Sequence, residues 1–324
     1  MLIQEWNIPP RRKKGSSIEK RLPKMKKRQQ HHVWKSYLRA WAHDEKIFCL
    51  QNGRIFESNI RGVAVERDFY KLSTLTKKDF EYINLLIGKS PNPVTRLHKD
   101  FLMLFSIFGW LKDNPPPHMA SDPEFESLID QQIINTEENF HSSIESNMMT
   151  ILNAIRQRDI SFYNDDEQCL KSLHFLSLQS FRTKGVRERV IEKSYPADFN
   201  IGNCWNILRH IFAMNVGSSL FLERKKRPLF LIENNTGVPF ITGDQPVINL
   251  LGSPQSTEPP PLLALYYPVT PWLAVILDET KERCGYGDGV LSIDQVSKLN
   301  SKIHAASFAQ VFGHSREVLA SLHS

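Results

Sequence analysis

Two spacings of hydrophobic residues divide this chain into a helical middle and strand-like flanks. In the middle, apolar residues recur every three to four positions, the period of an amphipathic helix. The segment from about 122 to 158 shows this best, and Asp122-Pro123 favours a helix start there. Its apolar positions are Ile129, Ile133, Phe140, Ile144, Met148, Ile151 and Ile155. The same period predicts further helices at 33–42, 76–88, 94–111, 166–181, 202–216 and 294–306.

Strand-like runs stand before and after this helical block. Residues 46–50 and 54–57 flank Asn52-Gly53, and this pair favours a hairpin because both central turn residues must tolerate positive φ. Further strands are predicted at 227–232, 239–242, 262–267, 273–277 and 308–312. This order predicts an α+β fold with an N-terminal hairpin, a central helical block and a C-terminal, mainly antiparallel sheet. We expect residues 30–324 to form a single domain.

Charge separates the first 29 residues from the rest. The net charge is +6, yet ten basic residues and one acid, Glu19, lie between Arg11 and Arg28. Residues 1–29 also lack any hydrophobic period, so we expect a disordered basic arm. Such an arm can contact the phosphates of a nucleic acid or nucleotide in a salt-dependent way. The alternative is a solubilising tail.

Several classes of protein are disfavoured. No apolar run approaches eighteen residues, so we expect no membrane span, and no secretory signal follows the basic run. The four widely spaced cysteines are typical of reduced thiols in a cytoplasmic protein. The phosphate-binding loop, the dinucleotide fingerprint and the serine-hydrolase motif are missing. We therefore expect no nicotinamide, flavin or haem cofactor.

Four polar blocks beside apolar anchors recur along the chain, at 30–39, 181–184, 240–247 and 267–271. They contain His31-His32 before Tyr37-Leu38-Arg39, then Arg182-Thr183, then a Phe-Ile-Thr-Gly-Asp-Gln-Pro sequence at 240–246, and finally Tyr-Pro-Val-Thr-Pro. Their order and content resemble the bacterial family catalogued as domain of unknown function 4238, over roughly residues 30–312. The chain departs from that pattern at Trp34-Lys35, where members often carry a proline. The resemblance implies no established activity.

Asp244 is the first candidate for chemistry. Gly243 permits an unusual backbone angle and Pro246 fixes one, so the carboxylate is expected in a tight turn at a strand end. There it could ligate a metal, orient a histidine or act as a base. Alternatively, it accepts hydrogen bonds from the amides of its own turn.

His31 and His32 form the second candidate. A neutral imidazole can ligate a metal or act as a base near neutral pH, and adjacent histidines point in different directions on a helix. We favour His32 as the base and leave His31 to contact substrate. The alternative is that both histidines have structural roles.

Glu138, His141 and Glu145 share one face of the long predicted helix, because their spacing is three and four residues. Carboxylates and an imidazole in this arrangement could supply metal ligands. The competing interpretation is a solvated polar face opposite the isoleucine stripe.

Arg182 and Thr183 stand at the end of a predicted helix. An arginine there could clamp a phosphate bidentately, or it could simply complement the helix dipole. Substrate contacts are assigned to His31, Arg39, Thr183, Thr242 and Gln245.

These candidates lead to one hypothesis and one rival. The hypothesis is a nuclease-like or phosphoryl-hydrolysing enzyme, a toxin or phage-defence effector, with His32, Arg182 and Asp244 as catalytic residues. A divalent metal, Mg or Mn, would be held by Asp244, Glu138 and Glu145. The rival is a non-catalytic module that binds nucleic acid or protein. An enzyme requires His32, Arg182 and Asp244 to converge in one place.

Overall fold

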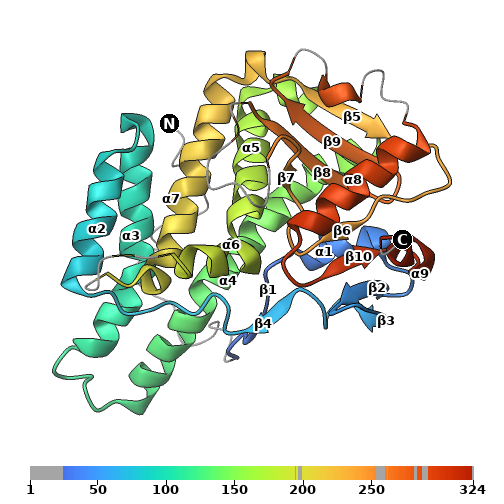
Figure 1. The fold of residues 1–324 in the computed structure, drawn as a ribbon. Coiled ribbons are helices and arrows are strands. Elements are labelled where there is room, and N and C mark those ends of the chain that lie inside the picture. The colour runs from blue at the N-terminus through green and yellow to red at the C-terminus, as the bar shows by residue number, and fades with distance from the viewer. Residues whose placement is uncertain are drawn as a thin grey trace, which may run out of the picture.

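The structure, a computed structural model, describes residues 25–193, 195, 199–252, 260, 262–280, 283–286 and 291–322. Within these ranges, a block of helices packs against antiparallel sheets (Figure 1). Strands lie in the N-terminal and C-terminal parts of the chain and the long helices lie between them. The predicted α+β class is therefore confirmed.

The helical block contains α2 (Lys77–Gly88), α3 (Asn92–Asp113), α4 (Pro123–Arg156), α5 (Asp166–Phe181), α6 (Lys184–Ile191) and α7 (Ile201–Leu222). Helix α4 begins where the sequence predicts, because the Asp122 side chain accepts a hydrogen bond from the Glu124 amide. Its isoleucine stripe is buried. Helices α5 and α7 approach closely at Gly217, where a Cβ atom would lie 2.9 Å from the His174 Cα. This block buries the polar face of α4 that carries the candidate site.

One four-stranded sheet joins the two ends of the chain. Its order is β3 (Arg54–Asn59), β2 (Lys46–Gln51), β10 (Val311–Gly313) and β6 (Thr242–Gly243). The predicted hairpin between β2 and β3 is confirmed, with positive φ at Asn52 (50°) and Gly53 (72°). The C-terminal strand β10 thus lies between an N-terminal strand and the Thr242–Gly243 strand, and it fixes their relative positions.

A second four-stranded sheet has the order β5 (Leu229–Glu233), β9 (Leu273–Asp278), β8 (Ala264–Thr270) and β7 (Ile248–Asn249). All six residues of β9 are buried, so both faces of the sheet are covered. Leu273, Val275 and Leu277 belong to the core shared with α4 and α5. Ala274 and Ile276 face the core that includes α8 (Ile293–Ala306). This continuous apolar run is typical of a central strand covered on both sides.

Shorter elements complete the fold. A two-stranded sheet pairs β1 (Gln29–His31) with β4 (Val65–Arg67). The remaining elements are α1 (Lys35–Leu38), α9 (Arg316–Ala320) and 3₁₀ turns at Arg39–Trp41, Ser161–Asn164, Arg224–Lys226 and Arg283–Gly285.

Three predicted segments need correction. The strand expected at 239–242 shrinks to Thr242–Gly243, because the Phe240 and Ile241 amides bond to the Pro271 carbonyl and the Asn300 side chain instead. The strand expected at 308–312 begins only at Val311. The helix expected at 33–42 is a single α turn followed by a 3₁₀ turn.

The expected basic arm lies mostly outside the described residues, but residues 25–29 are ordered. The Lys26 ammonium contacts Asp130 at 3.1 Å, and the Lys27 amide donates to Asn135 at 2.8 Å. Both partners lie on α4. The arm therefore joins the folded body at the helix that carries the candidate site.

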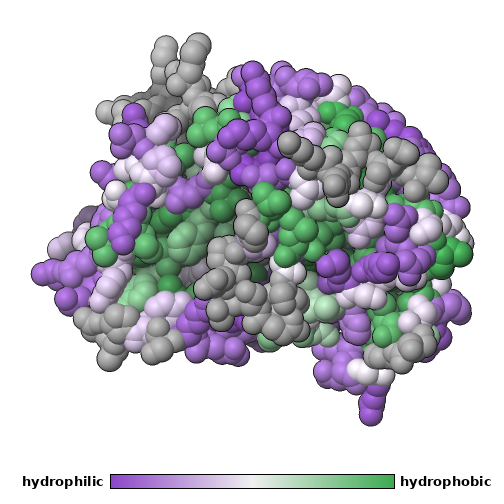
Figure 2. Space-filling view, turned by 45° about the horizontal axis from the view of Figure 1, so that its top comes forward, coloured by the Kyte–Doolittle hydropathy of each residue, from purple (hydrophilic) through white to green (hydrophobic). Residues whose placement is uncertain are grey.

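The surface is mixed in polarity. On the face in Figure 2, hydrophobic residues gather in and around a hollow that hydrophilic side chains border. Large exposed hydrophobic side chains on α2 and α3 are Leu85, Met103, Leu104 and Trp110. None of the helices in the described ranges has the length and hydropathy needed to cross a membrane.

Candidate functional site

Arg182 is the centre of a buried polar network. Its side chain is 2% exposed, although it stands at the C-terminal end of α5. Its Nε donates to the Tyr70 hydroxyl (2.9 Å), Nη1 to Glu145 Oε1 (2.6 Å) and Nη2 to the His31 carbonyl (2.8 Å). We call these four residues the Arg182 network. One guanidinium thus ties together β1, the turn after β4, α4 and α5.

The four polar blocks meet around this position. Thr183 Oγ1 donates to Gln245 Oε1 at 2.6 Å. The Tyr37 hydroxyl, from the first block, lies 2.7 Å from Thr242 Oγ1 of the third block and donates to the Pro268 carbonyl of the fourth block at 2.8 Å. Segments more than 200 residues apart are therefore joined by side-chain hydrogen bonds. Recurrence of polar blocks along the sequence reflects this shared buried network.

Asp244 is buried and its carboxylate is occupied. Oδ1 accepts from the Phe308 amide (2.7 Å), and Oδ2 accepts from the amides of Ala309 (2.7 Å) and Gln310 (3.0 Å). Burial raises the pKa of Asp244, and these three hydrogen bonds oppose the rise. The carboxylate therefore caps the loop at 308–310, about 65 residues away, rather than its own turn. This loop directly precedes β10.

Of the three residues proposed as catalytic, His32 lies near Arg182, whereas Asp244 is bonded to the loop at 308–310. His31 provides its carbonyl to Arg182, and the charge of Arg182 acts on the imidazole of His32. Burial, with Arg182 contributing, lowers the pKa of His32 to about 3. Nδ1 of His32 and Nε2 of His31 have no hydrogen-bond partner among the described residues. His32 is neutral at pH 7, but a pKa this low makes it a weak base there.

The predicted carboxylates lie beside this network. Glu145 pairs with Arg182, and burial raises the pKa of Glu145. Burial, together with the nearby charge of Glu145, raises the pKa of Glu138 to about 7. Arg39, by contrast, is exposed and pairs with Glu45, so it does not share the buried network.

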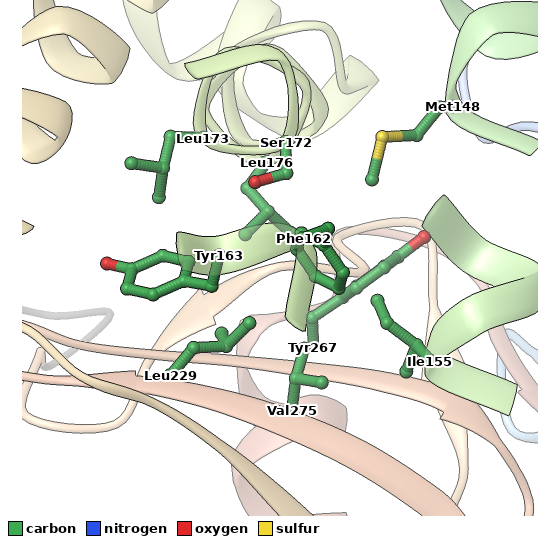
Figure 3. A pocket seen from close by; sticks show the side chains of 10 residues that line it. All are labelled: Met148, Ile155, Phe162, Tyr163, Ser172, Leu173, Leu176, Leu229, Tyr267 and Val275. Atoms are coloured by element: carbon green, nitrogen blue, oxygen red, sulfur yellow. The ribbon is translucent and has the colours of Figure 1, made fainter. Parts of the chain in front are cut away.

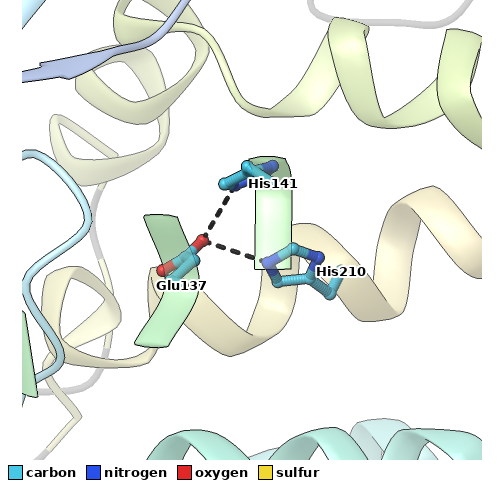
Figure 4. Close-up of side chains that lie close together, drawn as sticks. All are labelled: Glu137, His141 and His210. Carbon is cyan, nitrogen blue, oxygen red and sulfur yellow. Dashed lines mark hydrogen bonds and ion pairs between the residues drawn. The ribbon is translucent and has the colours of Figure 1, made fainter. Parts of the chain in front are cut away.

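The predicted metal ligands do not form a metal-like group; a different trio does. In the described part of the chain, the group of ligand atoms within 4.8 Å of one another is Glu137, His141 and His210 (Figure 4). Glu137 Oε1 lies 3.0 Å from His210 Nε2 and 3.4 Å from His141 Nε2. We call this trio the Glu137 cluster. Asp244, Glu138 and Glu145, the ligands expected from the sequence, are not in this group, although Glu137 and His141 lie on the same helix α4 as Glu138 and Glu145.

The sequence carried a signal for this cluster that we missed. Glu137 and His141 are four residues apart on α4, in line with the buried Ile133 and Ile144 rather than opposite them. Ionisable residues at core positions of an amphipathic helix need buried partners. His210 comes from α7, and no spacing in the sequence connects it to α4.

Burial sets the protonation of the Glu137 cluster. All three side chains are at most 1% exposed. Burial lowers the pKa values of His141 and His210. Burial alone would raise the pKa of Glu137, but the charge of Arg209 and the adjacent imidazoles of His141 and His210 outweigh it and lower that pKa. An ionised carboxylate and neutral imidazoles are the forms that bind a metal ion.

A second group of side chains holds the Glu137 carboxylate in place. The Asn206 amide donates to Oε2 at 2.6 Å, and the Arg209 guanidinium pairs side-on, with Nε 2.9 Å from Oε1. The Tyr70 ring lies 4.5 Å from the His141 ring and 5.0 Å from the Arg209 guanidinium carbon. Since the Tyr70 hydroxyl also bonds Arg182, Tyr70 connects the Arg182 network to the Glu137 cluster.

A separate cavity between α4, α5 and the β8–β9 sheet has no such chemistry (Figure 3). Its volume is about 10 Å³, which is room for about one water molecule. Its lining is almost wholly apolar, although Ser172, Tyr163 and Tyr267 are among the residues that line it, and the Tyr163 hydroxyl bonds the Arg227 carbonyl. This cavity is a packing defect of the core rather than a substrate site.

Comparison with known proteins gives one match. The family model described as Protein of unknown function (DUF4238) matches residues 29–317, which include the Arg182 network and the Glu137 cluster. No curated protein and no solved structure matches the chain.

Proposed function

The chain belongs to the DUF4238 family, and from that premise we propose that it is a metal-dependent hydrolase that cleaves phosphate esters of nucleic acid or nucleotides. One observation carries the proposal: Glu137, His141 and His210 present three ligand atoms within 4.8 Å of one another. Their lowered pKa values leave all three in the metal-binding form at neutral pH. A divalent metal would supply a bound water of lowered pKa and polarise a phosphoryl oxygen.

The donor atoms narrow the choice of metal. Two imidazole nitrogens and one carboxylate suit iron, zinc and related transition metals, and manganese as a transition metal accepts imidazole nitrogen more readily than magnesium, which prefers oxygen ligands. Of the two metals expected from the sequence, manganese is therefore the one that this cluster favours. Asn206 and Arg209 are the supporting residues that fix the orientation of the carboxylate.

The arm supports a nucleic-acid substrate. Its first described residues lie along α4, where the Lys27 ammonium donates to Asn139 at 2.7 Å. The charge of Lys27 also acts on Glu138, one residue from the metal cluster. The basic arm is thus joined to the folded body at α4, and phosphates that it binds would be brought to the same helix.

Metal titration tests this proposal directly. Protein freed of metal with a chelator is titrated with Mn²⁺ by calorimetry, and cleavage of labelled single-stranded and double-stranded nucleic acid is measured with the same ion. We expect one site per chain, and we expect His210→Gln to lose both binding and cleavage. His98→Gln is the matched control, because His98 is also buried with both ring nitrogens unpartnered in the described structure, but lies outside the cluster. Equal Mn²⁺ binding by the two variants would refute the assignment.

A non-catalytic binding module is the second candidate. The observation that favours it is that the Arg182 and Asp244 side chains each make three hydrogen bonds to other residues of the fold, which is the pattern of structural residues. For this candidate, nucleic acid binds, nothing is cleaved with any divalent ion, and His210→Gln binds as tightly as the parent.

A further inference from the structure

Arg209 has a buried hydrogen-bond donor with no acceptor. The residue is 0% exposed, its Nη2 donates to Glu137 Oε2 at 3.3 Å, and its Nε lies 2.9 Å from Glu137 Oε1 as an ion pair without hydrogen-bond geometry. Nη1 has neither a hydrogen-bond partner nor an ion-pair partner among the interactions of the described part of the protein. An unsatisfied buried guanidinium nitrogen is costly, because it has lost water without gaining an acceptor. Its place beside a candidate metal cluster indicates that an acceptor belongs there.

The charges around the Glu137 cluster indicate that this acceptor is negatively charged. Glu137 and Arg209 neutralise each other, as do Glu145 and Arg182. The imidazoles of the cluster are neutral. A divalent cation added to this fully buried group would leave two uncompensated positive charges, and burying unpaired charge is strongly unfavourable. An oxyanion that arrives with the metal would remove that excess.

We propose that the Glu137 cluster takes up its metal ion together with a phosphoryl oxyanion, and that Arg209 binds this oxyanion through Nη1. This inference rests on the metal site of the proposed function. Guanidinium donors suit phosphoryl oxygens, because their planar fork can bond two oxygens at once. The oxyanion would come from the scissile phosphate of a substrate or from free inorganic phosphate.

The consequence is reciprocal coupling between the two ligands. If phosphate raises the affinity for metal by some factor, metal raises the affinity for phosphate by the same factor. Arg209 has a double role in this scheme. It holds the Glu137 carboxylate through one edge of the guanidinium and presents the other edge to the oxyanion.

Calorimetry of the metal-free full chain tests the coupling. Mn²⁺ is titrated without anion, with inorganic phosphate, and with a mononucleotide. We expect at least a tenfold gain in Mn²⁺ affinity with a phosphoryl ligand, and tightening by the mononucleotide alone would assign the site to substrate rather than free phosphate. If Mn²⁺ binds with equal affinity in all three titrations, the coupling is refuted while the metal site stands. If Mn²⁺ does not bind at all, both proposals fall.

Two variants locate the effect. Arg209→Lys keeps the positive charge that neutralises Glu137 but loses the second edge of the guanidinium, so we expect weaker Mn²⁺ binding whose affinity no longer rises with phosphate. Arg187→Gln is the control, since Arg187 lies over Phe69 at 4.4 Å but is partly exposed and paired with Glu66 and Glu188. We expect its coupling to match the parent. Undiminished coupling in Arg209→Lys would refute the role of Arg209, and the parent titrations test the coupling even if this variant does not fold.

Discussion

Replacing Asp244 with asparagine separates a structural carboxylate from a catalytic one. The change keeps the size of the side chain and removes one of its two acceptor oxygens. Asparagine has one acceptor oxygen, so it can serve either the Phe308 amide or the amides of Ala309 and Gln310, but not both sets. The amide nitrogen would then face a backbone N–H. We therefore expect the loop at 308–310 to lose its cap and β10 to lose part of its support.

The magnitude follows from these three bonds. A buried amide left without an acceptor costs about 1–3 kcal/mol, and the remaining bonds weaken by about 1 kcal/mol each when the acceptor loses its charge. The sum is roughly 3–5 kcal/mol of unfolding free energy, which lowers the melting temperature by roughly 5–15 °C in a chain of this size.

Thermal and urea denaturation measure this cost. Asp122→Asn is the matched control, because Asp122 caps α4 through one amide and asparagine caps helices equally well. We expect that control to melt within about 2 °C of the parent. We also expect Mn²⁺ binding by Asp244→Asn to be unchanged below its melting temperature, since Asp244 is not in the Glu137 cluster. A variant that melts like the parent yet loses cleavage would show that our structural account of this carboxylate is wrong.

Three further predictions concern the network and the arm. Arg182→Met should destabilise the fold by about 3–5 kcal/mol, because it leaves Glu145 buried without its cation, and adding Glu145→Gln should restore part of the loss in urea denaturation. Burial lowers the pKa of His32 to about 3 in the folded protein, so as the pH falls the unfolded chain binds a proton at His32 before the folded protein does. The free energy of unfolding should therefore fall by up to about 1.4 kcal/mol per pH unit as pH drops from 6.5 toward 3. The urea midpoint of His32→Gln should depend less on pH over that range, and an unchanged slope would contradict this. Deleting residues 1–24 should flatten the dependence of log nucleic-acid affinity on log salt, whereas an unchanged slope would reduce the arm to a tail.

Local signals in the sequence predicted most elements of the fold. Asn52-Gly53 specified its hairpin because few residues tolerate positive φ at both positions, and the isoleucine stripe specified α4 within two residues at either end. The predictions failed where distant partners decide the structure. The strand at 308–312 was predicted too long because Asp244 takes the amides that would have paired there.

For the candidate site, too, the sequence indicated some of the residues, and distant partners decided the others. Of His32, Arg182 and Asp244, which the hypothesis requires to converge, His32 lies near the Arg182 charge, whereas the Asp244 carboxylate is bonded to the loop at 308–310. Helical spacing also placed ionisable residues on α4. We predicted Glu138 beside His141, whereas Glu137 is the carboxylate that contacts it, and the pairing with His210 depends on how α7 packs against α4.

The central position of β10 has a consequence for how this protein is made. β10 pairs with β2 on one side and β6 on the other, and 259 residues separate Gln51 from Gln310, which precedes β10. At about 5–20 residues per second, the ribosome needs roughly 10–50 s to add those residues. Throughout that time the β2 edge that pairs with β10 has no partner strand, and the loop at 308–310 that Asp244 caps has not been synthesised. The nascent chain therefore completes this sheet only after Val311–Gly313 have emerged, and loss of that strand would leave β2 and β6 without the strand that joins them.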